Sequence, residues 1–214
     1  ICELRFCMYI VVAGNIGSGK SLLCQLLQER LNWEIANDKS SQNPYFIDFC
    51  HNMYRWAYNA QLWFLIDHFR QTQRIIWNPN IIVQSRSIVE DATIFTYTLF
   101  SMGLISRRDY DTYMQLYNSM RNSVPVPDLL IYLRASVPML QKRLENSTDS
   151  WEQAIDVKYL TCLNECYEAW VKDYKGEIME VNVDSTDYFS NTTNCDQLLE
   201  NIKREVNDIS MFIK

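Results

Sequence analysis

Four short hydrophobic runs recur along the chain, and each has the β-branched and aromatic content of a buried strand. They are YIVVA (9–13), NIIVQ (80–84), DLLIYLRA (128–135) and EIMEVNV (177–183). Elsewhere, apolar residues return every three or four positions, which is the spacing of one helix face. This spacing predicts helices over 21–31, 52–76, 88–101, 107–122, 137–145, 152–174 and 195–210.

The order of these elements predicts the fold class. The strands are separated by segments too long for hairpins, which indicates parallel strands with helices on both faces of the sheet. DLLIYLRA is apolar almost throughout, as expected of a central strand covered on both faces. We therefore predict a three-layer α/β fold around a parallel sheet. The 214 residues fit one domain over 1–214, and no repeat or linker divides them.

Composition narrows the classes of function. A hydrophobic content of 48% excludes general disorder, and a net charge of -6 gives no electrostatic reason to bind nucleic acid. No apolar run approaches the roughly 18 residues of a transmembrane helix, so we expect no membrane span. The seven cysteines are scattered and lack C-x-x-C spacing, which favours free thiols in a reducing compartment over a zinc site.

A glycine-rich turn directly follows the first predicted strand. AGNIGSGKS, residues 13–21, matches the P-loop pattern, in which backbone N–H groups surround phosphates, the lysine reaches the outer ones and the hydroxyl ligates magnesium. We predict Mg²⁺ with ATP or another (deoxy)nucleotide as the ligand, and Ser21 as the metal-binding residue. The predicted phosphate-binding residues are Gly14, Asn15, Gly17, Ser18, Gly19, Lys20 and Ser21.

Further motifs lie at the predicted strand ends, where open α/β sheets place their ligands. With QNPYF (42–46), HNMYRWAYNAQLWFL (51–65) and VQSRSIVEDATIF (83–95) added to the P-loop, the sequence resembles the deoxynucleoside kinases, especially the short bacterial members. The resemblance runs from about residue 8 to about 187, with 1–7 as an N-terminal extension. It implies a P-loop kinase fold that transfers the γ-phosphoryl group of ATP to a deoxynucleoside 5′-hydroxyl.

The resemblance also assigns site residues by position. Asp38 stands where the family has its general-base glutamate, and Arg86 keeps the arginine of the family's acidic-Arg-Ser motif. Gln61 matches the base-reading glutamine, Asp91 the aspartate beyond the Arg-Ser motif, and Glu152 the glutamate that meets the sugar 3′-hydroxyl. Asp38 and Arg86 are thus the catalytic candidates, and the other three are the nucleoside-binding candidates.

Several positions depart from the family pattern, all of them catalytic or substrate-binding. An acid is replaced by Ser85, and two lid arginines by Ser147 and Asp149; such arginines are worth about 10³ to 10⁵ in phosphoryl-transfer rate. The other departures are Asp38, which is one methylene shorter, and Cys50 and His68, which replace a tyrosine and an arginine. Lys142 and Arg143 lie nearby, but we expect them on other faces of their helix.

These departures lead to three hypotheses. The first is a nucleotide-binding pseudokinase that serves as an accessory subunit of a larger assembly, comparable to the kinase-like subunit of mitochondrial respiratory complex I. The second is an active ATP-dependent deoxynucleoside kinase, and the third is the regulatory half of a heterodimeric kinase. Residues 67–77 and 108–120 are candidate contacts of a homodimer or heterodimer, although their aromatic and Met content equally suits a core.

Location is predicted from the start of the sequence. The chain begins at Ile1, with Met8 as its first methionine, which suggests that a segment was removed or that the numbering starts inside a longer product. A cleaved organellar presequence would give this pattern. We expect the matrix side of the mitochondrion, with the cytoplasm as the alternative.

Overall fold

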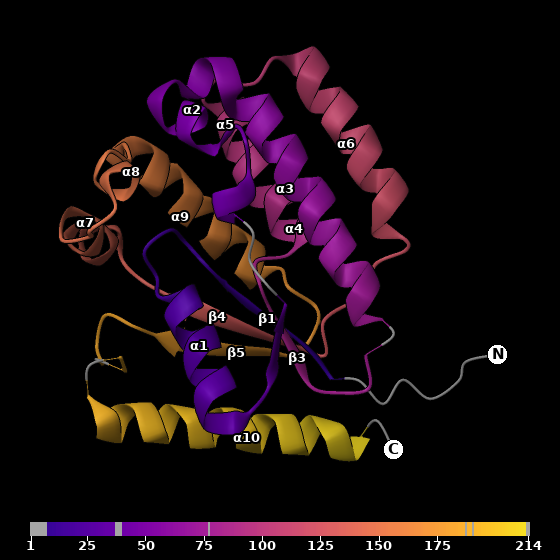
Figure 1. Ribbon diagram of the computed structural model, residues 1–214, viewed down its shortest axis with the longest axis vertical. Helices are drawn as coiled ribbons and strands as arrows, with labels where there is room; N and C mark the ends of the chain where they lie inside the picture. The colour runs from indigo at the N-terminus through magenta and orange to yellow at the C-terminus, as the bar shows by residue number, and fades with distance from the viewer. Residues whose placement is uncertain (1–7, 37–39, 77, 187, 190, 213–214) are drawn as a thin grey trace.

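The computed structural model describes residues 8–36, 40–76, 78–186, 188–189 and 191–212 (Figure 1). A five-stranded sheet lies at its centre, made of β1 (Tyr9–Gly14), β2 (Glu34–Ala36), β3 (Ile82–Ser85), β4 (Leu129–Arg134) and β5 (Ile178–Asn182). The strand order is β2-β3-β1-β4-β5, and every neighbouring pair is parallel. The carboxyl ends of all five strands therefore meet at one edge of the sheet.

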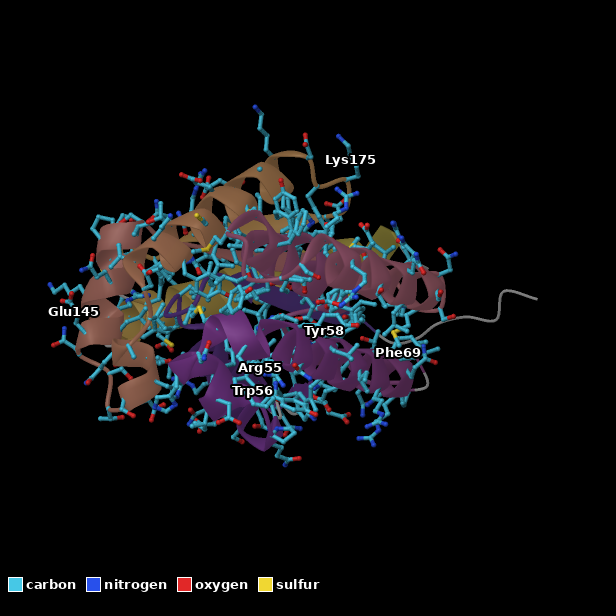
Figure 2. All side chains as sticks on the ribbon, turned by 90° about the horizontal axis from the view of Figure 1, so that it is seen from above. Arg55, Trp56, Tyr58, Phe69, Glu145 and Lys175 are labelled. Carbon is cyan, nitrogen blue, oxygen red and sulfur yellow. The ribbon has the colours of Figure 1, made fainter. Side chains whose placement is uncertain are left out.

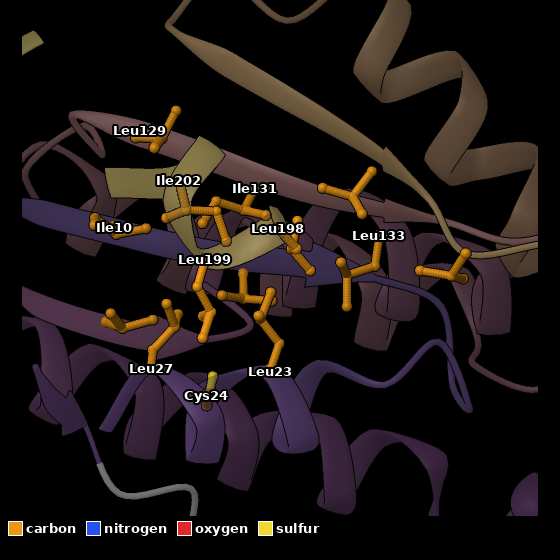
Figure 3. Close-up of a cluster of buried hydrophobic side chains, with 14 of the residues drawn as sticks. Ile10, Leu23, Cys24, Leu27, Leu129, Ile131, Leu133, Leu198, Leu199 and Ile202 are labelled. Carbon is orange, nitrogen blue, oxygen red and sulfur yellow. The ribbon is translucent and has the colours of Figure 1, made fainter. Parts of the chain in front are cut away.

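One face of the sheet is covered by α1 (Lys20–Leu31) and α10 (Thr192–Phe212) (Figure 1). Ile10 of β1 and Ile131 of β4 point to this side, where Leu23 of α1 and Leu199 and Ile202 of α10 pack against them (Figure 3). Alternate residues of a strand face opposite sides, so the intervening positions are left for the other face.

The opposite face is covered by α3 (Met53–Ile75), the π-helical turn η2 (Asp91–Thr96) and α9 (Val157–Lys172). Val11 and Tyr132 of the sheet pack among them. Farther from the sheet, α6 (Arg107–Arg121) packs on α3, and Tyr58 and Phe69 of α3 lie along this contact (Figure 2). The remaining elements are η1 (Ser40–Gln42), α2 (Phe46–His51), α4 (Ile88–Glu90), α5 (Tyr97–Ser101), α7 (Val137–Glu145) and α8 (Ser150–Gln153).

The predicted three-layer α/β architecture is confirmed, with local differences. The hydrophobic pattern missed β2, because three residues that are exposed or half-buried carry no strand signal. The helical segment predicted over 88–101 is confirmed in its bounds, and the π-helical η2 lies within it between α4 and α5. The helix predicted over 152–174 is broken into α8 and α9, because Asp156 accepts a hydrogen bond from the backbone N–H of Lys158 and begins a new helix there.

The segments proposed as dimer contacts contribute to the interior. Asp67, His68 and Ile75 of α3 are buried, as are Tyr113 and Tyr117 of α6. Across the described ranges, no helix combines the length and the apolar character needed to cross a membrane.

Candidate nucleotide site

The P-loop connects the central strand β1 to α1, and its glycines are required by its surroundings. Gly14 has φ 148°, and a Cβ atom there would lie 2.8 Å from the carbonyl oxygen of Leu133 on β4. Gly19 has φ 101°, and a Cβ atom there would lie 2.6 Å from the ring of Phe189. Larger residues would therefore strain the backbone and also displace its neighbours.

The side chains of Asn15 and Ser18, two of the predicted phosphate-binding residues, are buried. The buried Asn15 amide donates to the carbonyl of Leu160 at 3.0 Å and to Oδ1 of Asn164 at 3.2 Å, which fastens the loop to α9. Ser18 is fully buried, and its hydroxyl has no hydrogen-bond partner among the described residues. Phosphate contacts from these two positions would have to come from backbone N–H groups.

Lys20 and Ser21 begin α1, at the point where a helix N-terminus favours anions. The Lys20 ammonium donates to the carbonyls of Gly14 at 2.8 Å and Asn15 at 2.9 Å, so it lies directly along the loop. Gly17, Gly19, Lys20 and Ser21 line a cavity of about 590 Å³. This wall is the predicted phosphate-binding part of the site.

The same cavity extends along α3, η2 and the end of β3. Gln61, Arg86 and Glu152, predicted at separate points of the sequence, all line it. Asp91 does not, because it is fully buried behind the wall. The structure thus brings the P-loop and most of the predicted nucleoside positions into one site.

Arg86 follows β3 in a left-handed backbone conformation, with φ 65°. Its Nε lies 2.7 Å from Oδ1 of Asp91, its Nη2 donates to Oε1 of Gln61 at 3.3 Å, and its guanidinium lies 3.4 Å from the ring centroid of Phe95. Burial is the largest single influence and works to lower the pKa of Arg86, but the Asp91 carboxylate together with Tyr167, Tyr159 and Glu90 outweighs it, and the pKa is raised. Arg86 therefore carries its charge within the wall.

His68 was not among the predicted binding residues, yet it lines the cavity about two helix turns beyond Gln61 on α3. Its Nδ1 lies 2.6 Å from Oδ2 of Asp91, so Asp91 holds both His68 and Arg86. The available signal was the seven-residue spacing from Gln61, which places two residues on the same side of a helix.

Next to Asp91, Glu90 is fully buried and supports the site from behind. Its carboxylate accepts from the backbone N–H of Ser87 at 2.8 Å and from the Tyr167 hydroxyl at 3.0 Å. Burial raises the pKa of Glu90 despite these hydrogen bonds. The capping box of Ser87 and Glu90 fixes the turn that carries Arg86 and Asp91.

Comparison with known proteins decides the family. Residues 10–209 match the family model described as deoxynucleoside kinase. The chain belongs to the deoxynucleoside kinase family. The match includes most of α10, so it extends well beyond residue 187, where the resemblance seen in the sequence ended.

Family members with known names cover nearly the same length. The deoxyadenosine/deoxycytidine kinase of Bacillus subtilis (strain 168) is 29% identical over 202 residues, which are 93% of this chain and 93% of that protein. The deoxyadenosine kinase of Dictyostelium discoideum is 29% identical over 197 residues, which are 92% of this chain and 78% of that protein.

A solved structure shows the same fold. Deoxyadenosine kinase from M. mycoides, with the products dCMP and a flexible dCDP bound, superimposes with a TM-score of 0.81 at 26% identity. The alignment covers 92% of this chain and 100% of the M. mycoides chain.

The departures from the family pattern lie in the cavity wall. Ser85, Ser147 and Asp149 line it, as do Cys50 and His68. The cavity wall therefore carries Ser85, Ser147 and Asp149 at the positions where the family pattern has an acid and two arginines. The sixth departure, Asp38, lies outside the described residues, so its role as base stays a prediction.

Arg143 corrects one expectation about this family member. We expected it on a face of α7 away from the site, but it lines the cavity. Its Nη1 donates to the P-loop carbonyls of Gly17 at 3.3 Å and Ser18 at 3.1 Å, and its Nη2 donates to Val183 at 3.3 Å. The long Arg143 side chain reaches from α7 to the P-loop, which places its positive charge beside the predicted phosphate-binding residues.

Ser21 is the predicted metal-binding residue of the site. In the part of the chain that the structure describes, no group of three or more His, Cys, Asp or Glu side chains is arranged to hold one. The Ser21 hydroxyl in the cavity wall suits Mg²⁺ that is otherwise bound by phosphate oxygens and water. The donor set therefore fits a nucleotide-borne magnesium ion.

Proposed function

We propose that the protein is an ATP-dependent deoxynucleoside kinase, which transfers the γ-phosphoryl group to the 5′-hydroxyl of a deoxynucleoside. One observation carries the proposal: a single cavity joins the P-loop residues Lys20 and Ser21 to Gln61, Arg86 and Glu152. A donor phosphate on the loop and an acceptor sugar beside Arg86 would then share one enclosure. Membership of the family and the kinase names of its relatives support the same activity.

Each side chain of the site has a separate role in the proposed reaction. Lys20 and Arg143 would turn from their carbonyl partners toward phosphate oxygens and neutralise the charge on the moving group. Ser21 would hold the magnesium ion, which would supply positive charge to the phosphates when bound. Asp38 is the predicted acceptor of the 5′-hydroxyl proton, and Glu152 the predicted contact of the 3′-hydroxyl.

A second candidate is favoured by a specific observation. Ser85 ends β3 in the cavity wall without the charge of the family's acid, and Asp149 adds negative charge to the same wall. Both changes weaken stabilisation of the transferred group more than they weaken binding. The second candidate is therefore a nucleotide-binding member that transfers no phosphoryl group, for which an accessory role in an assembly such as respiratory complex I, and a mitochondrial location, remain predictions.

One experiment separates the two candidates. Purified protein is incubated with ATP, Mg²⁺ and each of the four deoxynucleosides, beside Lys20→Ala, which removes the P-loop cation, and Lys142→Ala, which removes an exposed neighbour of Arg143. The proposal expects monophosphate from the wild type and Lys142→Ala, and at least tenfold less from Lys20→Ala. If no variant gives product while ATP still raises the wild-type melting temperature, the second candidate is correct.

A further inference from the structure

Two cysteines of α9 form a pair of thiols outside the nucleotide cavity. Cys162 and Cys166 are four residues apart on this helix, so their side chains are neighbours on consecutive turns of one face. Both thiols are free, and both residues are half-buried, so part of each is open to solvent. Neither residue is among those that line the cavity. A site at this pair would therefore be separate from the nucleotide site.

The sulfur of Cys166 is held in place by a neighbouring helix. The Thr98 hydroxyl of α5 donates a hydrogen bond to Sγ of Cys166 at 3.3 Å. Thr98 itself is fully buried, so the contact orients the thiol from the protein side and leaves the side toward Cys162 to a ligand. A side chain that is already ordered loses little conformational freedom when it binds.

The spacing of the two thiols is unsuited to a disulfide. Residues four apart on a helix have Cβ atoms about 5 to 6 Å apart, whereas a disulfide needs Cβ atoms about 3.5 to 4.5 Å apart. A single atom bonded to both sulfurs would span the larger gap, because it places two bonds between the sulfurs where a disulfide has one. The geometry therefore suits a ligand that bridges two thiols through one atom.

The surroundings of Cys166 favour a neutral ligand over a metal cation. Burial is the largest influence and raises the pKa of the Cys166 thiol, the hydrogen bond from Thr98 opposes this, and Cys162 and Glu165 raise the pKa further. Cys166 is therefore protonated at neutral pH, whereas metal ions bind thiolates. Within the described ranges, no third His, Cys, Asp or Glu joins the pair, as a tetrahedral metal site would require.

We propose that Cys162 and Cys166 form a dithiol site for trivalent organoarsenicals, whose arsenic completes its three bonds with one carbon and two protein sulfurs. In the reaction with an arsenoxide, two arsenic–sulfur bonds form, the arsenic–oxygen double bond breaks, and both thiol protons leave with the oxygen as water. Arsenic stays trivalent and both sulfurs stay reduced, so no oxidant or reductant takes part. The site does not depend on the proposed kinase activity.

The second thiol determines how tightly the arsenical is held. After one arsenic–sulfur bond has formed, the other thiol lies on the adjacent helix turn, where its effective concentration is of the order of millimolar or higher. A free monothiol below that concentration competes poorly with the pair but displaces an arsenical from a single cysteine. With such a competitor present, we expect the pair to retain at least about tenfold more arsenical than either cysteine alone.

The test uses phenylarsine oxide on the reduced, full-length protein with glutathione as the competing monothiol. Intact-mass spectrometry measures the bound phenylarsenic on the wild type, Cys162→Ser and Cys166→Ser. The matched control is Cys50→Ser, which removes another half-buried free thiol on a different helix. Melting temperatures establish that each variant is folded.

The same protein also allows the two bound cysteines to be identified without any substitution. Accessible thiols of the arsenical-treated wild type are blocked with iodoacetamide, and the arsenical is then removed with dimercaptopropanol. The thiols that this step frees are labelled with N-ethylmaleimide and mapped by peptide mass spectrometry. This measurement decides even if a serine variant fails to fold.

We expect the wild type and Cys50→Ser to retain a phenylarsenic group that either α9 variant reduces at least about tenfold. N-ethylmaleimide should mark both Cys162 and Cys166 in the wild type. Equal retention in the wild type and both α9 variants, or N-ethylmaleimide labels that omit either of these two cysteines, would overturn the inference. Neither readout measures phosphorylation, so a failure here leaves the kinase proposal standing, and a failure of the kinase proposal leaves the dithiol site standing.

Discussion

Arg143 offers the sharpest perturbation, because its side chain connects three carbonyls of the site. In Arg143→Ala, the carbonyls of Gly17, Ser18 and Val183 lose a charged donor. Hydrogen bonds to charged groups are worth about 1.5 to 3 kcal/mol when buried, and Arg143 is only half-buried, so we expect about 1 kcal/mol less stability.

The expected effect on catalysis is larger. Arginines that contact the transferred group are worth about 10³ to 10⁵ in rate, but Arg143 also has carbonyl partners to leave, so we expect kcat/KM to fall about 100-fold. That corresponds to about 2.7 kcal/mol of transition-state stabilisation. Arg143→Lys keeps the charge without the fork that spans several carbonyls, so its activity should lie between those of the wild type and Arg143→Ala.

The assay measures deoxynucleoside phosphorylation at saturating and limiting ATP, together with the melting temperature. Lys142→Ala is the matched control, since Lys142 is the exposed preceding residue on the same helix. If Arg143→Ala behaves like Lys142→Ala in both measurements, the assignment of a functional cation to α7 is wrong.

Three further predictions concern the scaffold of the site. Asn15→Ala should lower the free energy of unfolding by about 1 to 3 kcal/mol in chemical denaturation, because buried amide contacts to α9 are lost; the same loss as in an exposed Asn80→Ala would count against it. Gly19→Ala should weaken ATP binding at least about tenfold in calorimetry, because φ 101° and the 2.6 Å approach to Phe189 exclude a Cβ atom; unchanged affinity would contradict this. Burial raises the pKa of Glu90 above its ordinary 4.5, so the folded state holds the Glu90 proton more tightly than the unfolded state does. The stability that this proton contributes is lost as pH rises from about 4.5 through the raised pKa. The melting temperature of Glu90→Gln relative to the wild type should therefore rise with pH, and parallel curves of melting temperature against pH would refute this.

The sequence predicts the fold where a signal is local. β1 and β4 are nearly uninterrupted apolar runs, because both of their faces are buried, and the P-loop pattern is complete within eight residues. β2 escaped prediction because it is three residues long and pairs with β3 at the edge of the sheet, and the local sequence cannot report this pairing. Breaks within helices were missed for a similar reason, since single caps decide them.

The candidate site was less predictable because its contacts join distant residues. Arg143 lies 126 positions from Gly17, and helix periodicity places its Cα without describing the reach of a long side chain. His68 and Asp91 are 23 positions apart, so nothing in the local pattern shows that Asp91 lies behind the wall and acts on the cavity through its partners. Asn15 likewise matches a phosphate-binding motif while its side chain fastens the loop to α9.

The distribution of charge in the described cavity wall shows which cations are available for the proposed phosphoryl transfer. Arg86 is paired with Asp91, so its charge is largely balanced before any ligand binds. Lys20 and Arg143 are held by carbonyl oxygens, which can be exchanged for phosphate oxygens without leaving a buried cation unpaired. Asp149 opposes them from the lid side. In the proposed kinase reaction, stabilisation of the phosphoryl group would therefore depend on these two cations and the loop's N–H groups, and Arg143 would take over part of what the replaced lid arginines supply in the family pattern.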